Sequence, residues 1–350
     1  MRVLVAMSGG VDSSVAAALL VEQGHEVVGA TLKLWGGHSD SGCCSVGDVE
    51  DARRVAQQLG IDHHVFNLTE EFDRAVVRPY VEAHAQGRTP NPCIECNRTI
   101  KFDRLMARAE RLGFDRLATG HHARVTRGGT FRLRRGADPD KDQSYVLSML
   151  GQPELGRVLF PVGEMTKAEV RAHATRNGLR TAAKPDSQDV CFIGSAEGRQ
   201  GFLADKLSFH SATVTDGRGE SVGSVEAIEL VTVGQRRGMG HGTDGARRYV
   251  VAVDVPARRV TVGSAAEAMT SSLTLHDASL TWVDLPLQHG DRAVAQVSAH
   301  GRPAPCAIAR TESGLVVQFD VPQRPVAPGQ TVALYDDVDP DAVVGAGIAA

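Results

Sequence analysis

Apolar and polar positions alternate along the N-terminal half of the chain with the periods of strands and helices. Residues 2–7 form an apolar run that enters a glycine-rich turn, and residues 14–22 have helical spacing and end at Gly24. The same order repeats, with strands predicted at 27–34, 64–68 and 116–119 and helices at 46–59, 70–85, 102–112 and 167–177. Strands that alternate with helices predict a parallel sheet covered on both faces.

The pattern changes after about residue 200. Short β-rich segments separated by Gly or Asp turns follow at 221–233, 248–254, 260–262, 293–298, 306–309, 314–319 and 331–335. We therefore predict an α/β fold in three parts: a parallel-sheet catalytic domain at 1–200, a small β-rich central domain at 201–270 and a C-terminal β-barrel at 271–350. At 350 residues the chain is too long for one ordinary core, which agrees with several domains.

Composition narrows the class of protein. The chain is 42% hydrophobic and 23% charged, as globular proteins are, and its longest apolar stretch, 15–21, is far too short to cross a bilayer. The N-terminus has the pattern of a strand rather than a signal peptide, so we expect a soluble, cytoplasmic protein with no membrane partner. Six cysteines in a chain of this length do not predict a disulfide scaffold, and they indicate reduced thiols available for metal binding or catalysis.

Charge is unevenly distributed, although the formal net charge is only −4. Between residues 98 and 135 there are eleven basic and three acidic side chains, whereas the chain after Thr311 is acidic. A local basic region in a mildly acidic protein favours a specific polyanionic partner. The alternative is a pair of arginine-rich, solvated helix faces.

The glycine-rich turn after the first strand has the features of a phosphate site. In the segment 8–13, Ser-Gly-Gly-Val-Asp-Ser, Gly9 and Gly10 allow close approach of the backbone to a ligand, and the following amides lie at a helix N-terminus that favours an anion. Walker A and dinucleotide patterns are absent. The segment resembles the PP-loop of the ATP pyrophosphatases, and this resemblance implies cleavage of ATP between its α and β phosphates.

The cysteines allow several interpretations before any family is considered. Cys93 and Cys96 form a Cys-x-x-Cys in the proline-rich stretch 89–97, for which we expect a rigid loop; the pair is consistent with half of a zinc site, a redox pair or a nucleophile. Cys43 and Cys44 are adjacent, which is poor spacing for a tetrahedral metal site. Cys191 has an apolar flank, and a buried structural cysteine is its default interpretation.

Taken in order along the chain, these segments resemble the bacterial tRNA-specific 2-thiouridylases, the MnmA or TrmU family. The resemblance covers essentially the whole chain. The matching segments are 8–13, 43–45 with 51–56, 89–92 with 96–97, 118–121, 141–145, 187–193 and 232–236. It implies a PP-loop ATP pyrophosphatase domain, ATP with nucleotide-bound Mg²⁺ as cofactor, and tRNA as the polyanionic partner.

The resemblance also implies the chemistry. ATP would adenylate O2 of uridine 34, the wobble base of the tRNAs for Lys, Glu and Gln, so that AMP becomes the leaving group. A persulfide on Cys191 would supply sulfur to C2, with Cys96 as the nucleophile, leaving a Cys96–Cys191 disulfide for reduction. A thiolate is needed for this attack, and neighbouring Arg98 and Lys101 could lower the thiol pKa or contact phosphates instead. The sulfur donor would be a cysteine desulfurase or a relay protein.

Individual site residues follow from the same resemblance. ATP contacts are expected from Ala6, Met7, Ser8, Gly9, Gly10, Val11, Asp12, Ser13, Leu32 and Gly120. Contacts with tRNA are expected from Asn91, Pro92, Cys93, His121, Lys141, Asp142, Gln143 and Gln330, with the two prolines around Asn91 holding that segment rigid for a flipped base. Leu32 could instead be plain strand core, residues 141–143 a solvated loop, and His121 a histidine bonded to the backbone.

Two positions depart from the family pattern. Cys93 stands where many members carry an Asp proposed as acid or base, and because Asp titrates near about 4 and Cys near about 8.5, that role cannot be transferred unchanged. Cys93, Cys96 and Cys191 could alternatively hold a [4Fe–4S] cluster with one open iron as the sulfur donor; otherwise no resident metal is expected. Residues 298–300, Ser-Ala-His, replace an Arg-Tyr-Arg stretch, which puts C-terminal tRNA contacts in question. We assign Cys43, Cys44 and Cys306 to packing.

Two other functions compete with this one. A metabolite ligase with the same loop, of the argininosuccinate or GMP synthetase kind, would not need the thiols, and no glutamine-hydrolysing domain is apparent. A non-enzymatic RNA-binding module with a zinc-stabilised Cys-x-x-Cys would bind zinc and form no AMP in response to tRNA.

Overall fold

The N-terminal part of the chain contains one parallel sheet. The computed structural model describes residues 1–35, 45–186, 190–194, 197–242, 245–312 and 314–350. The sheet has the order β3-β2-β1-β4-β7, and every neighbouring pair is parallel. Its strands are β1 (Arg2–Ala6), β2 (Glu26–Lys33), β3 (Asp62–Asn67), β4 (Arg116–Thr119) and β7 (Val158–Leu159). The predicted parallel sheet is confirmed.

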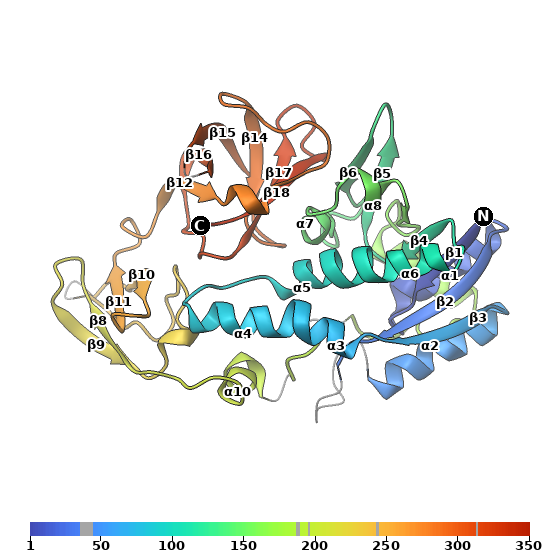
Figure 1. Cartoon of the computed structure of the whole chain (residues 1–350), viewed down its shortest axis with the longest axis horizontal. Coiled ribbons are helices and arrows are strands. Elements are labelled where there is room, and N and C mark those ends of the chain that lie inside the picture. Colours follow the sequence, from blue (N-terminus) through green and yellow to red (C-terminus); the bar gives the residue numbers. More distant parts are fainter. Residues whose placement is uncertain (36–44, 187–189, 195–196, 243–244, 313) are drawn as a thin grey trace.

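Helices cover both faces of this sheet (Figure 1). On one face, α1 (Val11–Glu22) and α9 (Lys167–Arg176) bury small and branched side chains such as Val15. The other face packs against a second cluster that contains Phe102. The other helices here are α2 (Val46–Leu59), α3 (Thr69–Phe72), α4 (Arg78–Ala85), α5 (Pro92–Glu95), α6 (Met106–Arg111), α7 (Ser144–Leu147), α8 (Gln152–Leu155) and α10 (Gly198–Ala204).

The segment that carries Cys93 and Cys96 is helical, so the expectation of a rigid loop there is wrong. α5 continues through wider π-type turns at Cys96–Leu105 into α6, just as α3 continues through Asp73–Val77 into α4. The Asn91 side chain accepts hydrogen bonds from the backbone N–H groups of Cys93 and Ile94, and proline occupies the first helical position. Both features favour the start of a helix.

The second half of the chain forms two further sheets. The central one has the order β10-β11-β8-β9, and the C-terminal one is antiparallel with the order β12-β16-β15-β14-β17-β18-β13. A bridge between Leu275 and Ala349 brings β12 to the end of β18, so the sheet curls as the predicted barrel requires. The bounds are β8 (Ala212–Thr215), β9 (Ser221–Val225), β10 (Tyr249–Asp254), β11 (Arg259–Gly263), β12 (Thr270–Leu275), β13 (Thr281–Trp282), β14 (Arg292–Gln296), β15 (Ala304–Thr311), β16 (Gly314–Gln323), β17 (Thr331–Asp336) and β18 (Val343–Ile348), with short 3₁₀ turns at Ile228–Leu230 and Asp277–Ser279.

Ion pairs join the first and last parts of the chain. A hairpin of β5 (Ala123–Arg127) and β6 (Phe131–Arg135), which the sequence pattern did not predict, carries Arg134, and its guanidinium lies 2.5 Å from the Asp339 carboxylate. Arg124 pairs with Asp341 at 3.2 Å. Part of the basic stretch between residues 98 and 135 therefore binds the acidic C-terminal part of the same chain.

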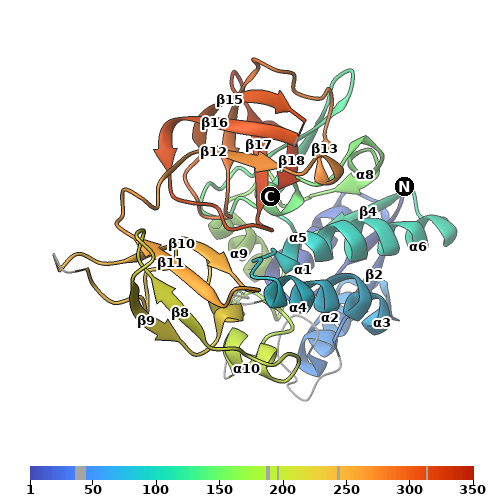
Figure 2. The same ribbon diagram turned by 60° about the vertical axis from the view of Figure 1, so that its left-hand side comes forward.

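The three parts surround α4 and α5. Figures 1 and 2 place the C-terminal sheet over α5 and the central sheet at the C-terminal end of α4. The sheets follow the predicted order of parts, and the boundaries at 200 and 270 stay predictions. None of the described helices combines the length and hydropathy that a membrane span requires.

Candidate functional site

The glycine-rich segment lies where the strand order of the parallel sheet reverses, between β1 and β4. Ligands of open α/β sheets bind outside the carboxyl ends of the strands at such a point. Gly9 has a φ of +73°, and a Cβ there would come within 2.3 Å of the carbonyl oxygen of Asp48, so this position requires glycine. Gly10 is the N-cap of α1, which directs the first helical amides out of the turn.

Gly120, directly after β4, packs against the first turn of α1. A Cβ on Gly120 would lie 2.5 Å from the backbone nitrogen of Ser13, so a larger residue would push the two elements apart. Ser13 Oγ accepts from the Ser8 N–H at 3.2 Å and donates to the Gly10 carbonyl at 3.1 Å, and Ser14 Oγ donates to the same carbonyl at 2.8 Å. The serine hydroxyls thus fix the shape of the turn.

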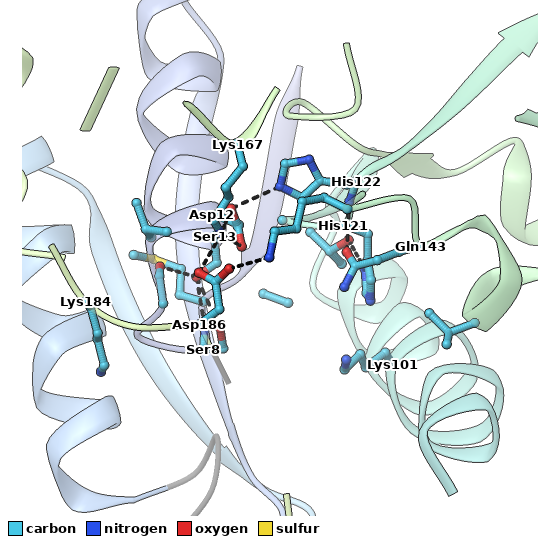
Figure 3. Close-up of a pocket in the computed structure, with 18 of the residues that line it drawn as sticks. Ser8, Asp12, Ser13, Lys101, His121, His122, Gln143, Lys167, Lys184 and Asp186 are labelled. Carbon is cyan, nitrogen blue, oxygen red and sulfur yellow. Dashed lines mark hydrogen bonds and ion pairs between the residues drawn. The ribbon is translucent and has the colours of Figure 1, made fainter. Parts of the chain in front are cut away.

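Ion pairs cross the mouth of the turn (Figure 3). Lys167 Nζ lies 2.7 Å from both carboxylate oxygens of Asp12 and 2.9 Å from Asp186. Asp186 also pairs with Lys141 at 2.9 Å and with Arg171 at 2.8 Å. Burial alone would raise the pKa of Asp186, but hydrogen bonds from Lys167 and Lys141 outweigh it and lower this pKa to about 2. Two lysines therefore stand beside the loop, each held by a carboxylate.

Asp12 has a second partner on the β4 side of the site. His122, which is buried, places Nε2 3.1 Å from Asp12 Oδ1. Burial opposes ionisation of Asp12, but the hydrogen bonds from His122 and Lys167 prevail and hold its pKa below the ordinary value. The loop carboxylate is therefore ionised at neutral pH.

A third lysine reaches the site from the opposite side. Lys184 Nζ lies 2.6 Å from Asp48 and 2.7 Å from Asp51, both on α2. Burial alone would lower the pKa of Lys184, but these hydrogen bonds outweigh it and raise the pKa. Asp48 is anchored by Ser45, whose hydroxyl caps α2 and donates to the Asp48 carboxylate at 2.6 Å.

These groups surround a pocket of about 480 Å³, which is within the range of small-molecule sites. Most of the residues predicted to contact ATP line it, namely Ala6, Met7, Ser8, Gly10, Val11, Asp12, Ser13, Leu32 and Gly120, while Gly9 packs behind the turn. Leu32 and Leu34 give one wall an apolar surface, and Lys101, Lys141, Lys167 and Lys184 supply cations. The pocket thus combines an apolar wall with a cationic mouth, as a nucleoside polyphosphate requires.

Four residues predicted to contact tRNA line the same pocket: His121, Lys141, Asp142 and Gln143. Burial lowers the pKa of His121 well below its ordinary value, so the ring is neutral at pH 7. Asp142 pairs with Arg135 at 2.9 Å, and Gln143 Oε1 accepts from the backbone N–H of His122 at 2.9 Å. Residues 141–143 are thus half-buried and bonded within the protein, which favours the pocket over a fully solvated loop, and their contact with tRNA stays a prediction.

Two of the predicted catalytic cysteines belong to or border the core of the N-terminal part. Cys96 is buried in the core of the N-terminal part, and Cys191 packs against that core. The ring of Tyr80 lies 5.6 Å from that of Phe192, the neighbour of Cys191. Burial raises the pKa of Tyr80, and the thiol of Cys93, which is exposed, adds to this rise. Tyr80 is therefore near both the exposed Cys93 and the segment that carries Cys191.

The same helical segment connects the cysteines to the pocket. Cys96 begins the π-type turns and Lys101, further along them, lines the pocket. Arg98, predicted to act with Lys101, instead pairs with Glu95 at 2.7 Å. In the described part of the chain, no group of three or more His, Cys, Asp or Glu side chains is arranged to hold a metal ion.

The remaining predicted residues have diverse surroundings. Cys306 is buried, donates to the Ala293 carbonyl at 3.2 Å, and has its pKa raised to about 11 by burial, as packing predicts. Ala299 and His300 line the pocket, so the C-terminal part reaches it. Cys43 and Cys44 lie outside the described residues, as does the segment 187–189.

Several pocket residues were not singled out from the sequence. Lys167 and His122 meet Asp12, which is far from both in sequence, and Lys184 and Asp186 belong to no recognisable motif. Their spacing gave no signal, because the pairing depends on α9 and α1 lying side by side on one face of the sheet.

Family models match the chain in three consecutive parts. They are a tRNA methyl transferase HUP domain at residues 1–195, a tRNA methyl transferase PRC-barrel domain at 200–264 and an aminomethyltransferase β-barrel domain at 271–349. The chain is 44% identical to the tRNA-specific 2-thiouridylase MnmA of Roseiflexus sp. (strain RS-1), over 99% of this chain and 98% of the relative. It is 45% identical to the protein of the same name from Mycobacterium avium (strain 104), with the same coverage.

Solved structures show a more distant likeness. The U34-tRNA thiolase NcsA from Methanococcus maripaludis, determined with its [4Fe–4S] cluster, has a TM-score of 0.36 and 18% identity over 59% of this chain and 63% of that one. A 4-thiouridine synthetase in complex with RNA and ATP has a TM-score of 0.37 and 19% identity over 55% of this chain and 44% of that one. Because both TM-scores are below 0.5, neither the cluster nor the RNA of these structures is inferred for this chain.

Proposed function

The chain belongs to the MnmA family of tRNA-specific 2-thiouridylases, and we propose that it transfers sulfur to C2 of uridine 34 in the tRNAs for Lys, Glu and Gln at the expense of ATP. The observation that carries the proposal is the helical segment that joins the two halves of the site. It begins beside Cys93 and Cys96, and it lines the cationic pocket with Lys101.

The first step is adenylation of the base. The uridine O2 attacks the α-phosphorus of ATP, and pyrophosphate leaves into the turn formed by residues 8–13. Backbone amides at the start of α1, together with Lys167 and Lys184, neutralise the charge that develops on the leaving group. Mg²⁺ entering with the nucleotide would supply further charge neutralisation in this pocket.

The second step replaces oxygen with sulfur. The outer sulfur of a Cys191 persulfide attacks C2 and AMP leaves, so that tRNA is linked to Cys191 through a disulfide. The Cys96 thiolate then attacks the Cys191 sulfur, releases the electron pair to the tRNA as 2-thiouridine, and leaves a Cys96–Cys191 disulfide for reduction. The packing of Cys191 against the core that contains Cys96 supports this pairing. A cysteine desulfurase or a relay protein supplies the persulfide.

Asn91, Pro92 and Cys93 meet the flipped base. Asn91 caps α5 and Cys93 is exposed at the first turn, so this helix end presents a fixed polar surface to a nucleotide taken out of the stack. Cys93 stands where many members carry an Asp proposed as acid or base, and because a free thiol titrates higher than a carboxyl, a role as base at this position would need a higher pH.

A persulfide is proposed as the donor in preference to an iron–sulfur cluster. The described cysteines form no metal-binding group, whereas Cys191 and Cys96 share one hydrophobic core. Protein purified without oxygen and free of iron should therefore thiolate tRNA at the full rate. Activity that rises in proportion to bound iron would overturn the choice.

The test of the function is incubation with ATP, unmodified tRNA and a persulfide source, followed by nucleoside analysis. We expect 2-thiouridine at position 34 and one AMP for each sulfur transferred. Formation of ADP in place of AMP would refute the mechanism. Cys191→Ala should still consume ATP with tRNA but form no 2-thiouridine, whereas the activity of a metabolite ligase with the same loop would not change on this substitution.

A further inference from the structure

Thr89 is bonded through each of its polar groups to a distant part of the chain. Its backbone N–H donates to the Pro328 carbonyl at 2.8 Å, and its carbonyl accepts from Gln330 Nε2 at 2.6 Å. Its hydroxyl donates to Thr232 Oγ1 at 3.4 Å. Thr89 therefore connects the N-terminal part to both the central and the C-terminal parts.

The C-terminal side of this connection is itself fixed. The backbone of Gln330 accepts from the Ala349 N–H at 2.8 Å, and the N–H of Gly329 donates to the Ala349 carbonyl at 2.9 Å. Gly329 has a φ of +89°, and a Cβ there would lie 3.3 to 3.5 Å from Arg88, Thr89 and the next residue, so the two segments are in close contact. The Gln330 amide thus extends from a rigid edge of the C-terminal sheet.

The segment that Thr89 begins carries the predicted base-binding helix end. Asn91, two residues later, caps α5 through hydrogen bonds from the N–H groups of Cys93 and Ile94. Only Pro90 separates the Thr89 carbonyl from Asn91, and its ring fixes one of the few backbone torsions between them, so a displacement of the carbonyl is passed on to the cap. The orientation of the first turn, with Cys93 and Cys96, depends on where Thr89 is held.

We propose that Gln330 is a positioning residue, whose side-chain amide holds the Thr89 carbonyl and thereby fixes the helix end that carries Cys93 and Cys96. The C-terminal part in this way sets the geometry of the cysteine site from a distance. The consequence of the Gln330–Thr89 hydrogen bond for thiolation rests on the function proposed above, whereas the effect of this bond on the helix end does not. A direct contact between Gln330 and tRNA, expected from the family resemblance, is a different role. It would raise the KM for tRNA, whereas positioning lowers kcat.

The first test needs neither tRNA nor ATP. In Gln330→Met the length of the side chain is kept and the donor is lost. We measure the rate at which iodoacetamide alkylates Cys96 in the reduced full-length enzyme, with Cys93 followed in the same digest by mass spectrometry. Because Cys96 is 7% exposed, alkylation requires opening of the helix end. The rate should rise about three- to tenfold, the change expected from the loss of one hydrogen bond.

Gln323→Met is the matched control. Gln323 lies in the same sheet and donates to the Val321 carbonyl at 2.8 Å within its own strand, so the chemical change is the same without the link to Thr89. Gly329→Ala perturbs the same contact by another route, through its positive φ and the added Cβ, and should also accelerate alkylation of Cys96. This second variant keeps the test decisive if Gln330→Met folds poorly.

The second test separates positioning from tRNA contact. With saturating tRNA, Gln330→Met should lower the kcat for 2-thiouridine formation about three- to tenfold and leave the KM for tRNA within about twofold. A raised KM with an unchanged kcat, or Cys96 alkylation equal to that of Gln323→Met, would overturn the proposal. If the wild-type enzyme makes no 2-thiouridine, the proposed function fails, and the alkylation rates still decide the role of Gln330.

Discussion

Replacement of Asp186 with Asn should make the protein less stable and bind ATP more tightly. The Asp186 carboxylate pairs with Lys141, Lys167 and Arg171 at 2.8 to 2.9 Å and lies at the pocket wall. These cations stabilise the folded state through Asp186, and the same carboxylate opposes the approach of phosphates to the two lysines.

The size of the stability effect follows from the pKa of Asp186. A folded-state value of about 2, against about 3.9 in the unfolded chain, corresponds to about 2.5 kcal/mol at neutral pH. Because 21% of the side chain is exposed, solvent screening reduces the expected loss to about 1–2 kcal/mol. The folded-state pKa is depressed, so this stability is present above about pH 4 and is lost as the pH falls from about 4 to 2.

The effect on ATP comes from the charge removed. Loss of one negative charge from a site that accepts polyphosphate relieves about 1 kcal/mol of repulsion when the effective dielectric lies between those of protein and water. The Kd for ATP should therefore fall about fivefold, and the gain should shrink at high salt.

The assay uses the two tryptophans of the chain. In a Trp282→Phe background, the fluorescence of Trp35, which packs against Phe192, reports urea unfolding of the N-terminal part. Asp103→Asn, in which an exposed carboxylate 3.6 Å from Arg104 is neutralised, is the control and should change stability by less than about 0.5 kcal/mol. An unfolding midpoint of Asp186→Asn equal to that of the control, or weaker ATP binding, would refute the reasoning.

Three further predictions concern the pocket and the thiols. Gly120→Ala should abolish ATP binding in equilibrium dialysis, because its Cβ displaces the first turn of α1, while Gly129→Ala, with nothing within 4 Å, should bind ATP as the wild type does. Lys167→Met should raise the Kd for ATP at least about tenfold, as the loss of one charged phosphate partner predicts, and an unchanged Kd would contradict its proposed role. Burial raises the pKa of Cys306 to about 11. In native protein at pH 8 this thiol should therefore react with iodoacetamide at least about a hundredfold more slowly than exposed Cys93. Similar rates in peptide mass spectrometry would disprove this.

Local signals in the sequence determined much of the fold. The alternation of strand and helix patterns was sufficient to predict the parallel sheet, and the strand predicted at 116–119 and the helix at 46–59 have the observed bounds. The phosphate turn was also predictable, since glycine at a strand-to-helix junction is required by backbone geometry whatever the rest of the chain does. The helix at Cys93 and Cys96 was not predicted, because the two prolines there favour a loop, whereas the cap that Asn91 forms begins a helix.

Only the tertiary structure decided which charges and thiols meet. Asp12 pairs with Lys167 and His122, and Thr89 with Gln330, over separations in the chain that no periodic pattern reports. Such pairs form because packing of helices on a twisted sheet, and of one sheet on another part of the chain, brings remote segments within about 3 Å. Periodicity fixes which face of an element is buried, whereas the partner across that face depends on how the buried faces are assembled.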